Sequence, residues 1–131
     1  HLLGIETEKM LNQSTFLGPI FEGFVASEII KQQVGSGRSR ELYYFRDQQG
    51  LEVDFVVNLG DRRLLFIEAK ASRTVTSEMA QPLERLAKAT SRYRVSRAVV
   101  HRSSKEGPTT TALLRGVPAV PVEELGSLIR R

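Results

Sequence analysis

The chain has 131 residues, the size of one domain with a substantial core, and it lacks cysteine, which excludes disulfides and thiolate metal sites. Hydrophobic residues make up 40% and charged residues 26%, and with no signal peptide and no apolar run of membrane-spanning length these values favour a cytoplasmic globular protein without a membrane segment. The formal net charge of +4 permits phosphate binding, but an ordinary mixed surface would show it equally well.

Residues 1–18 are expected to form a linker or docking segment, with a helical pattern over Leu2–Asn12. The chain begins at His1 rather than methionine, and we therefore expect the biological protein to be longer. A second helix is predicted from about Pro19 to Gln33, because proline suits a first turn and apolar residues cover most of its circumference. That pattern predicts a largely buried helix.

Glu22 lies on an apolar stripe of this helix, so its carboxylate should be either paired or functional. A glutamate that complements the helix dipole is the simpler alternative. Glu28, farther along the same helix, could contribute to a site instead.

A basic loop and a strand over Glu41–Asp47 are predicted next. In the loop, Arg38 and Arg40 are candidate phosphate contacts, although a solvated hairpin tip is the commoner role of such residues. In the strand, Tyr43 and Tyr44 could stack on bases, but strand aromatics more often fill a core.

The stretch Leu51–Lys70 is predicted to form two strands around a tight turn, and it carries the residues best suited to chemistry. Glu52 and Asp54 share a face of the first strand, and Glu68 and Lys70 share a face of the second. Charges on apolar strands must be paired or bound to a metal to offset their desolvation. Asp54 and Glu68 could hold a hard cation such as Mg²⁺ through oxygen ligands. Lys70 could then hold an attacking water or stabilise phosphate charge.

This candidate site depends on the register of the two strands. We expect a three-residue loop, Gly60-Asp61-Arg62, with Leu59 opposite Arg63. That register places Asp54 opposite Glu68, and their side chains project together. A two-residue loop without a bulge would direct the two carboxylates to opposite faces.

The next helix is predicted from about Gln81 to Arg92, with Pro82 in its first turn and Ser77 as an upstream cap. Its outer face carries basic residues that either follow a phosphate backbone or simply face solvent, namely Arg85, Lys88 and Arg92. A strand follows over Val95–Arg102, and His101 near its end is expected to be structural because no partner ligand is nearby in the sequence.

Short strands are predicted over Thr109–Leu114 and Val117–Val120, before a last helix over Val122–Ile129. The full order is then helix, helix, three antiparallel strands, helix, strand, short strand and helix. Such an order predicts an α/β fold with a mixed central sheet flanked by helices on both faces.

Asp54, followed after thirteen residues by Glu68-Ala69-Lys70, resembles the Asp…(Asp/Glu)-x-Lys signature of the PD-(D/E)xK nuclease superfamily. The flanking segments GPIFEGFVASEII, ELYYFRDQQGLEVDFVV and LFIEAKAS resemble the C-terminal nuclease-like domain that follows the ATPase core in many prokaryotic AAA+-type ATPases. This resemblance covers roughly Leu2 to Leu128.

The resemblance implies a restriction-endonuclease-like αβββαβ core and a metal-dependent DNA phosphodiesterase. Asp54 and Glu68 would bind Mg²⁺ or Mn²⁺, and Lys70 would orient the water that attacks the phosphodiester. Glu22 would assist at the metal, and Glu52 would support these residues. DNA and an ATPase module of the same polypeptide are the implied partners, and the segment itself has no P-loop for ATP hydrolysis.

A catalytically inactive accessory domain of an ATPase is the alternative, serving regulation, DNA docking or protein interaction. The carboxylates would then be paired with Lys70 and with an arginine such as Arg46. Asp54 and Glu68 carboxylates within about 5 Å of each other in a solvent-reachable cleft would favour a metal site, and a space-filling salt bridge would favour the accessory role. A third possibility is a protein-interaction domain that acts through the helix at Leu2–Leu11.

Overall fold

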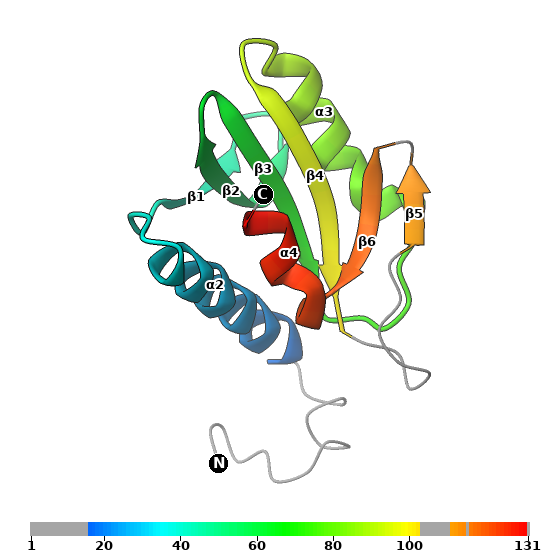
Figure 1. Ribbon diagram of the computed structural model, residues 1–131. Coiled ribbons are helices and arrows are strands. Elements are labelled where there is room, and N and C mark those ends of the chain that lie inside the picture. Colours follow the sequence, from blue (N-terminus) through cyan, green and yellow to red (C-terminus); the bar gives the residue numbers. More distant parts are fainter. Residues whose placement is uncertain (1–15, 103–110, 115, 131) are drawn as a thin grey trace, which may run out of the picture.

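The computed structural model describes residues 16–102, 111–114 and 116–130 (Figure 1). The longer described elements, in chain order, are α2 (Leu17–Gly35), β1 (Leu42–Arg46), β2 (Glu52–Gly60), β3 (Arg63–Lys70), α3 (Gln81–Ala89), β4 (Arg94–His101), β5 (Thr111–Leu114), β6 (Val117–Pro121) and α4 (Leu125–Ile129). Short 3₁₀ helices precede α3 and α4, at Ser77–Ala80 and Val122–Glu124. The helix predicted over Leu2–Asn12 lies outside the described residues.

The described strands form one six-stranded sheet in the order β1-β2-β3-β4-β6-β5. Neighbouring strands run antiparallel from β1 to β3, parallel from β3 through β4 to β6, and antiparallel again between β6 and β5. The sheet is therefore mixed, and the predicted α/β fold class is confirmed.

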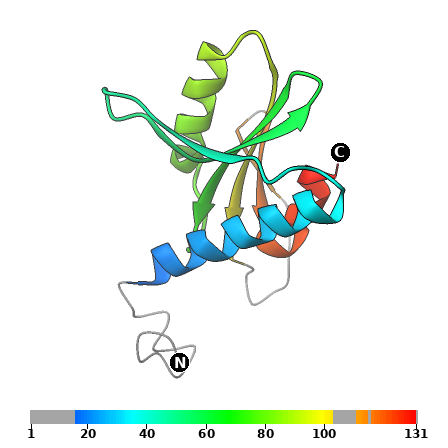
Figure 2. The same cartoon turned by 90° about the vertical axis from the view of Figure 1, so that its left-hand side faces the viewer.

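Helices cover both faces of the sheet, as the apolar pattern predicts (Figures 1 and 2). Buried residues of α2 and α4 form one core cluster with β2, β3 and β4, centred on Ile29, Ile67 and Ile129. Buried residues of α3 form a second cluster on the other face, centred on Phe66 and Leu83. The ion pair between Arg97 of β4 and Glu84 of α3 adds a polar contact on that second face.

Helix α2 buries only one stripe, so the prediction of a largely buried helix is wrong. Its buried residues recur every fourth position and comprise Phe21, Val25, Ile29 and Gln33. Ile20 and Phe24 remain 36% and 49% exposed although both are apolar. The apolar residues do surround the helix, but the described chain supplies a sheet on one side of it alone. Gly37, at φ +74, lies beyond the end of the helix in a conformation that suits glycine.

The β2–β3 hairpin has the predicted register at its centre and a different turn. Pairs from Phe55–Ile67 to Asn58–Leu64 follow the register that would place Asp54 opposite Glu68. The turn contains only Asp61 and Arg62, both at positive φ, and not the three residues predicted. The register shifts between Asn58 and Gly60, so a bulge compensates for the shorter turn.

A second bulge lies at the other end of β2, against the edge strand β1. Tyr43 pairs with Val56 and Phe45 pairs with Val53, so the single residue Tyr44 spans both Asp54 and Phe55. Val53 packs in the α3 cluster, whereas Phe55 packs against the α2 cluster. Val53 and Phe55 are two positions apart and would face the same side in a regular strand, but here they face opposite sides of the sheet.

Two further boundaries differ from the sequence-based expectation. The regular part of α3 ends at Ala89 rather than near Arg92, where the Thr90 hydroxyl donates a 2.7 Å hydrogen bond to the Leu86 carbonyl. Ser77 does not cap a helix, because the 3₁₀ turn starts at Ser77 itself and carries no side-chain cap bond. The predicted strands over 95–102 and 117–120 and the last helix are confirmed to within one to three residues.

None of the helices in the described residues is both long enough and apolar enough to cross a membrane.

The turn between β1 and β2 gives a first test of the fold. Asp47 Oδ1 accepts hydrogen bonds from the backbone N–H groups of Gln49 and Leu51, at 2.9 and 2.8 Å. We expect Asp47→Ala to lower the free energy of unfolding by about 1–2 kcal/mol, because both amides lose a charged acceptor. Asp47→Asn keeps an oxygen acceptor and should cost less than half as much in urea unfolding. Equal losses in the two variants would contradict this account.

Candidate functional site

The strands β2 and β3 separate where their carboxylates lie, and side chains take over the cross-strand hydrogen bonds. The regular pairing extends to Phe55 and Ile67. One residue farther on, the Asp54 N–H donates to Glu68 Oε1 at 3.0 Å. In return, the Ala69 N–H donates to Asp54 Oδ2 at 2.9 Å. We call this arrangement the strand fork; it brings the two carboxylates together as predicted.

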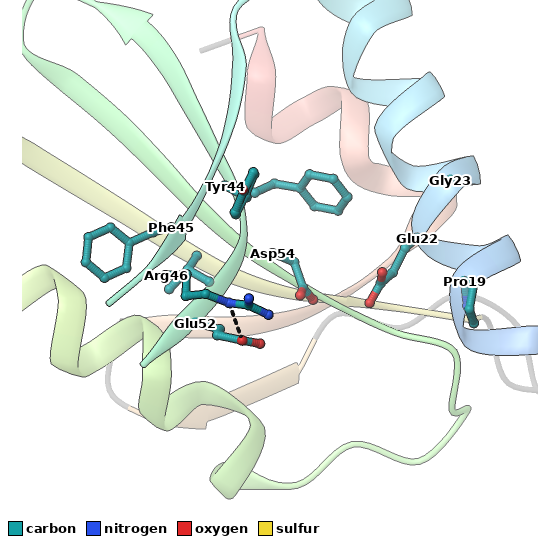
Figure 3. A pocket seen from close by; sticks show the side chains of 10 residues that line it. Pro19, Glu22, Gly23, Tyr44, Phe45, Arg46, Glu52 and Asp54 are labelled. Atoms are coloured by element: carbon teal, nitrogen blue, oxygen red, sulfur yellow. Dashed lines mark hydrogen bonds and ion pairs between the residues drawn. The ribbon is translucent and has the colours of Figure 1, made fainter. Parts of the chain in front are cut away.

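Asp54 borders an open hollow of about 420 Å³ (Figure 3). Its walls come from the start of α2, from β1 and from β2, and are lined by Pro19, Glu22, Gly23, Tyr44, Phe45, Arg46, Glu52, Val53, Asp54 and Phe55. Figure 3 shows the Glu22 carboxylate directed toward that of Asp54. Glu28 instead pairs with Lys31 at 3.1 Å, so Glu22 is the α2 carboxylate that faces the strand fork.

The surroundings of Glu22, Asp54 and Glu68 raise the pKa of each carboxyl group above its ordinary value. Burial and, second, the charge of Asp54 raise the pKa of Glu68 from 4.5 to about 7. Burial is also the main cause that raises the pKa of Asp54 and of Glu22. For Glu22 the next cause is the charge of Asp54, which raises the pKa further. Such clustered, repelling carboxylates are typical of functional sites.

Lys70 supplies the nearest opposing charge. Its Nζ lies 3.7 Å from Glu68 Oε2, and its side chain is 38% exposed while that of Glu68 is 7% exposed. The ammonium group lowers the pKa of Glu68, Asp54 and Glu22, but less than burial raises it. Lys70 therefore has one side on the strand fork and another toward solvent.

Glu52 is tied to Arg46 rather than to the strand fork. Arg46 Nε lies 2.8 Å from Glu52 Oε1, and both side chains are more than half exposed. The Glu52 charge still raises the pKa of Asp54 as the smallest of four causes. The accessory-domain hypothesis expects Arg46 to pair with a carboxylate of the site. In the structure Arg46 pairs with Glu52, and not with Asp54 or Glu68.

The predicted phosphate contacts do not gather at the hollow. Arg85 and Lys88 are exposed on α3, and Arg92 is exposed in the turn that leads to β4. Arg40 is exposed in the loop before β1, whereas Arg38 is partly buried and its Nη1 is buried without a hydrogen-bond partner. None of these five is among the residues that line the hollow.

An arginine cluster lies at the opposite end of the sheet, and of its members only Arg92 is a predicted phosphate contact. The Arg94 N–H donates to the Arg62 carbonyl at 2.8 Å, and Arg63 pairs with Arg94 in the parallel ladder. Arg92 follows α3 at the same end, and together these four residues form what we call the arginine end. Arg63 and Glu68 lie five positions apart on β3, which corresponds to about 17 Å along the strand. The parallel pairing of β3 with β4 brings Arg62 and Arg63 beside Arg94. No local pattern in the sequence indicates that these two strands pair.

The two tyrosines of β1 are exposed, so the expectation that they fill a core is wrong. Tyr43 is 58% exposed and Tyr44 is 77% exposed, since β1 is the edge strand of the sheet. His101 is buried, and its Nδ1 lies 2.7 Å from the Arg102 carbonyl oxygen, which fits the structural role expected of it.

The donor chemistry of the strand fork fits a hard cation only in part. No group of three or more His, Asp or Glu side chains within the described ranges already forms an arrangement that could hold a metal ion. Asp54 and Glu68 each accept one backbone hydrogen bond, and the second carboxylate oxygen of Glu68 lies 3.7 Å from Lys70 Nζ. Two carboxylates are a sufficient protein contribution for Mg²⁺, which usually completes its shell with waters and substrate phosphates.

The chain belongs to the family described as Domain of unknown function (DUF4143), whose model matches residues 17–125. This match spans α2 through the start of α4 and includes the strand fork, the hollow and the arginine end. No curated protein and no solved structure matches the chain significantly.

The raised pKa of Glu68 predicts how the stability of the fold depends on pH. Because the folded pKa of about 7 exceeds the unfolded value, the folded state binds more protons between about pH 4.5 and 7. Stability should therefore fall as pH rises through that window. We expect the Tm measured with EDTA to decrease from about pH 5 to about pH 8, and to decrease less in Glu68→Gln.

Asp61→Asn serves as the control for this measurement. Asp61 is an exposed acid at the far end of the same hairpin, and asparagine tolerates its positive φ. This variant should keep the pH dependence of the wild type. A Glu68→Gln profile that follows the wild type would show that Glu68 ionises freely in the folded protein.

Proposed function

We propose that this domain is a metal-dependent nuclease module that hydrolyses DNA phosphodiesters and works as part of an ATPase-containing polypeptide. The observation that carries the proposal is the strand fork. It gathers Asp54 and Glu68 beside Lys70, and Glu22 faces Asp54 across an open hollow that Glu68 and Lys70 do not line. The association with an ATPase rests on the sequence resemblance, to which membership in the DUF4143 family is a coarser support.

Asp54 and Glu68 are the residues that would hold Mg²⁺ or Mn²⁺. Their pKa values are raised by burial and, for Glu68, by the neighbouring negative charge. A cation would offset both effects, because it replaces lost solvation and screens the repulsion between the carboxylates. Bound at such a site, a divalent cation supplies Lewis acidity toward water and phosphate.

The other side chains have roles that follow from their positions. Lys70 lies partly in solvent and can donate hydrogen bonds to an attacking water or to a phosphate oxygen. Glu22 can accept a proton or a hydrogen bond across the hollow, and its raised pKa makes it a better proton acceptor than an ordinary glutamate. Glu52 acts through charge alone, since Arg46 engages its carboxylate.

The arginine end supports nucleic acid as the substrate. Exposed Arg62, Arg92 and Arg94 concentrate positive charge away from the strand fork, next to the exposed Asp61 and with Lys88 near the end of α3. A DNA backbone could contact this end while another part of the same strand reaches the hollow. Arg38 and Arg40 belong to a different loop and are weaker candidates for the same role.

A second candidate function is a catalytically inactive accessory domain, and specific contacts favour it. The Glu68–Lys70 ion pair and the two backbone hydrogen bonds already satisfy much of the strand fork without a cation. The carboxylates would then be structural, joining β2 to β3 where the regular ladder ends. The domain would serve as a regulatory or docking module.

Metal binding and DNA cleavage distinguish the two candidates. We expect Mg²⁺ or Mn²⁺ to raise the Tm of the wild-type domain and to support cleavage of plasmid or branched DNA. Asp54→Asn and Glu68→Gln should lose at least about a hundredfold in cleavage rate, because a positioned carboxylate is removed from the metal site while the shape is kept. Asp61→Asn should cleave as the wild type does.

Each further outcome points to one candidate. A Tm that ignores both cations, with no cleavage by any variant, would reject the nuclease and leave the accessory domain. Cleavage that persists in Asp54→Asn and Glu68→Gln would place the activity outside the strand fork.

A further inference from the structure

Tyr44 is the most exposed of the large apolar side chains in the described residues, and it lines the hollow beside Asp54. It is 77% exposed on the edge strand β1. The bulge in β2 sets Tyr44 against both Asp54 and Phe55, so the backbone irregularity that shifts Asp54 also positions this ring. Tyr43, its neighbour, is 58% exposed but does not line the hollow.

The charges around the hollow restrict what can bind there. Three carboxylates line it, from Glu22, Glu52 and Asp54, and its only lining cation, Arg46, is already paired with Glu52. A phosphate group would meet net negative charge unless a metal cation were present. The exposed aromatic wall of the hollow is the ring of Tyr44, because Phe45 and Phe55, which also line the hollow, pack against core clusters on opposite faces of the sheet. That wall suits a flat apolar or π-bonded group.

A nucleobase is such a group, and the volume of the hollow is sufficient for one. At about 420 Å³ the hollow lies within the usual size range of ligand sites. Tyrosine rings on exposed strands stack with bases in proteins that bind single-stranded nucleic acid. A base inside a duplex already has both faces covered by its neighbours, so only an unpaired or extruded base can use this wall.

We propose that Tyr44 forms a base-stacking subsite, so that the strand fork acts on single-stranded or locally unpaired DNA rather than on intact duplex. The inference rests on the proposed nuclease function for its choice of nucleic acid. It adds to that function the class of substrate and a residue that determines it. The stacked base would anchor its nucleotide at the hollow, where the adjoining phosphate reaches Asp54.

The test measures binding separately from cleavage. Fluorescence anisotropy would follow a labelled single-stranded oligonucleotide and a blunt-ended two-strand duplex of matching sequence, with Ca²⁺ and with EDTA. The domain should bind the single strand more tightly than the duplex. Tyr44→Ala should weaken single-strand binding about tenfold and leave duplex binding unchanged, since one stacking contact is lost.

Two matched variants control for surface and shape. Tyr44→Phe keeps the ring and should bind within about twofold of the wild type. Tyr43→Ala removes an exposed tyrosine from the same strand outside the hollow and should also bind as the wild type does. Urea unfolding of each variant would confirm that the edge strand is intact.

The inference would be overturned if the wild type bound duplex as well as single strand, if neither bound, or if Tyr43→Ala and Tyr44→Ala weakened binding equally. Cleavage assays on the same samples separate this result from the proposed function. Tyr44-dependent binding without cleavage in Mg²⁺ or Mn²⁺ would retain the subsite and reject the nuclease. Cleavage without Tyr44 dependence would retain the nuclease and reject the subsite.

Discussion

The reciprocal hydrogen bonds of the strand fork are the constraint on which the candidate site depends. Asp54 and Glu68 each accept a backbone N–H from the other strand, so the carboxylates replace the ladder where β2 and β3 separate. The same contacts bring two acids into a buried position that raises both of their pKa values. The two carboxylates that join β2 to β3 therefore also repel each other. A proton, the Lys70 ammonium group or a bound cation would reduce this repulsion and so stabilise the junction of the two strands.

Two irregularities in β2 make this arrangement possible. The bulge near Leu59 corrects a two-residue turn, which on its own would have shifted the register by one and separated the carboxylates. The bulge at Asp54 and Phe55 changes which face of the sheet the strand presents. One bulge thus preserves the pairing of the two acids, while the other lies at Asp54 and Phe55, which line the hollow. Bulges next to functional sites commonly redirect a side chain in this way.

Features that depend on the periodicity of a single segment, such as its strands, could be predicted from the sequence. Features that depend on how segments pack against one another, such as bulges and exposure, could not. Alternation in Leu51–Lys70 was enough to predict both strands. The central register is the predicted one, although a two-residue turn and a bulge produce it in place of the predicted three-residue loop. Neither bulge could be predicted, since each depends on how strands meet. The exposure of Ile20, Phe24 and Tyr44 was missed for the same reason. Hydrophobicity indicates that a side chain can be buried, and only the assembled fold determines whether anything covers it.

The net charge of +4 conceals a separation of charge along the sheet. Acids gather where β3 ends, at Glu68, and arginines gather where it begins, at Arg63. A polyanion would be attracted to the arginine end and repelled from the carboxylates until a cation neutralised them. In the proposed nuclease, attraction of nucleic acid and entry of a phosphate into the hollow would thus be separate steps with different salt and metal requirements. Composition alone, which sums the two ends, could not have revealed this division.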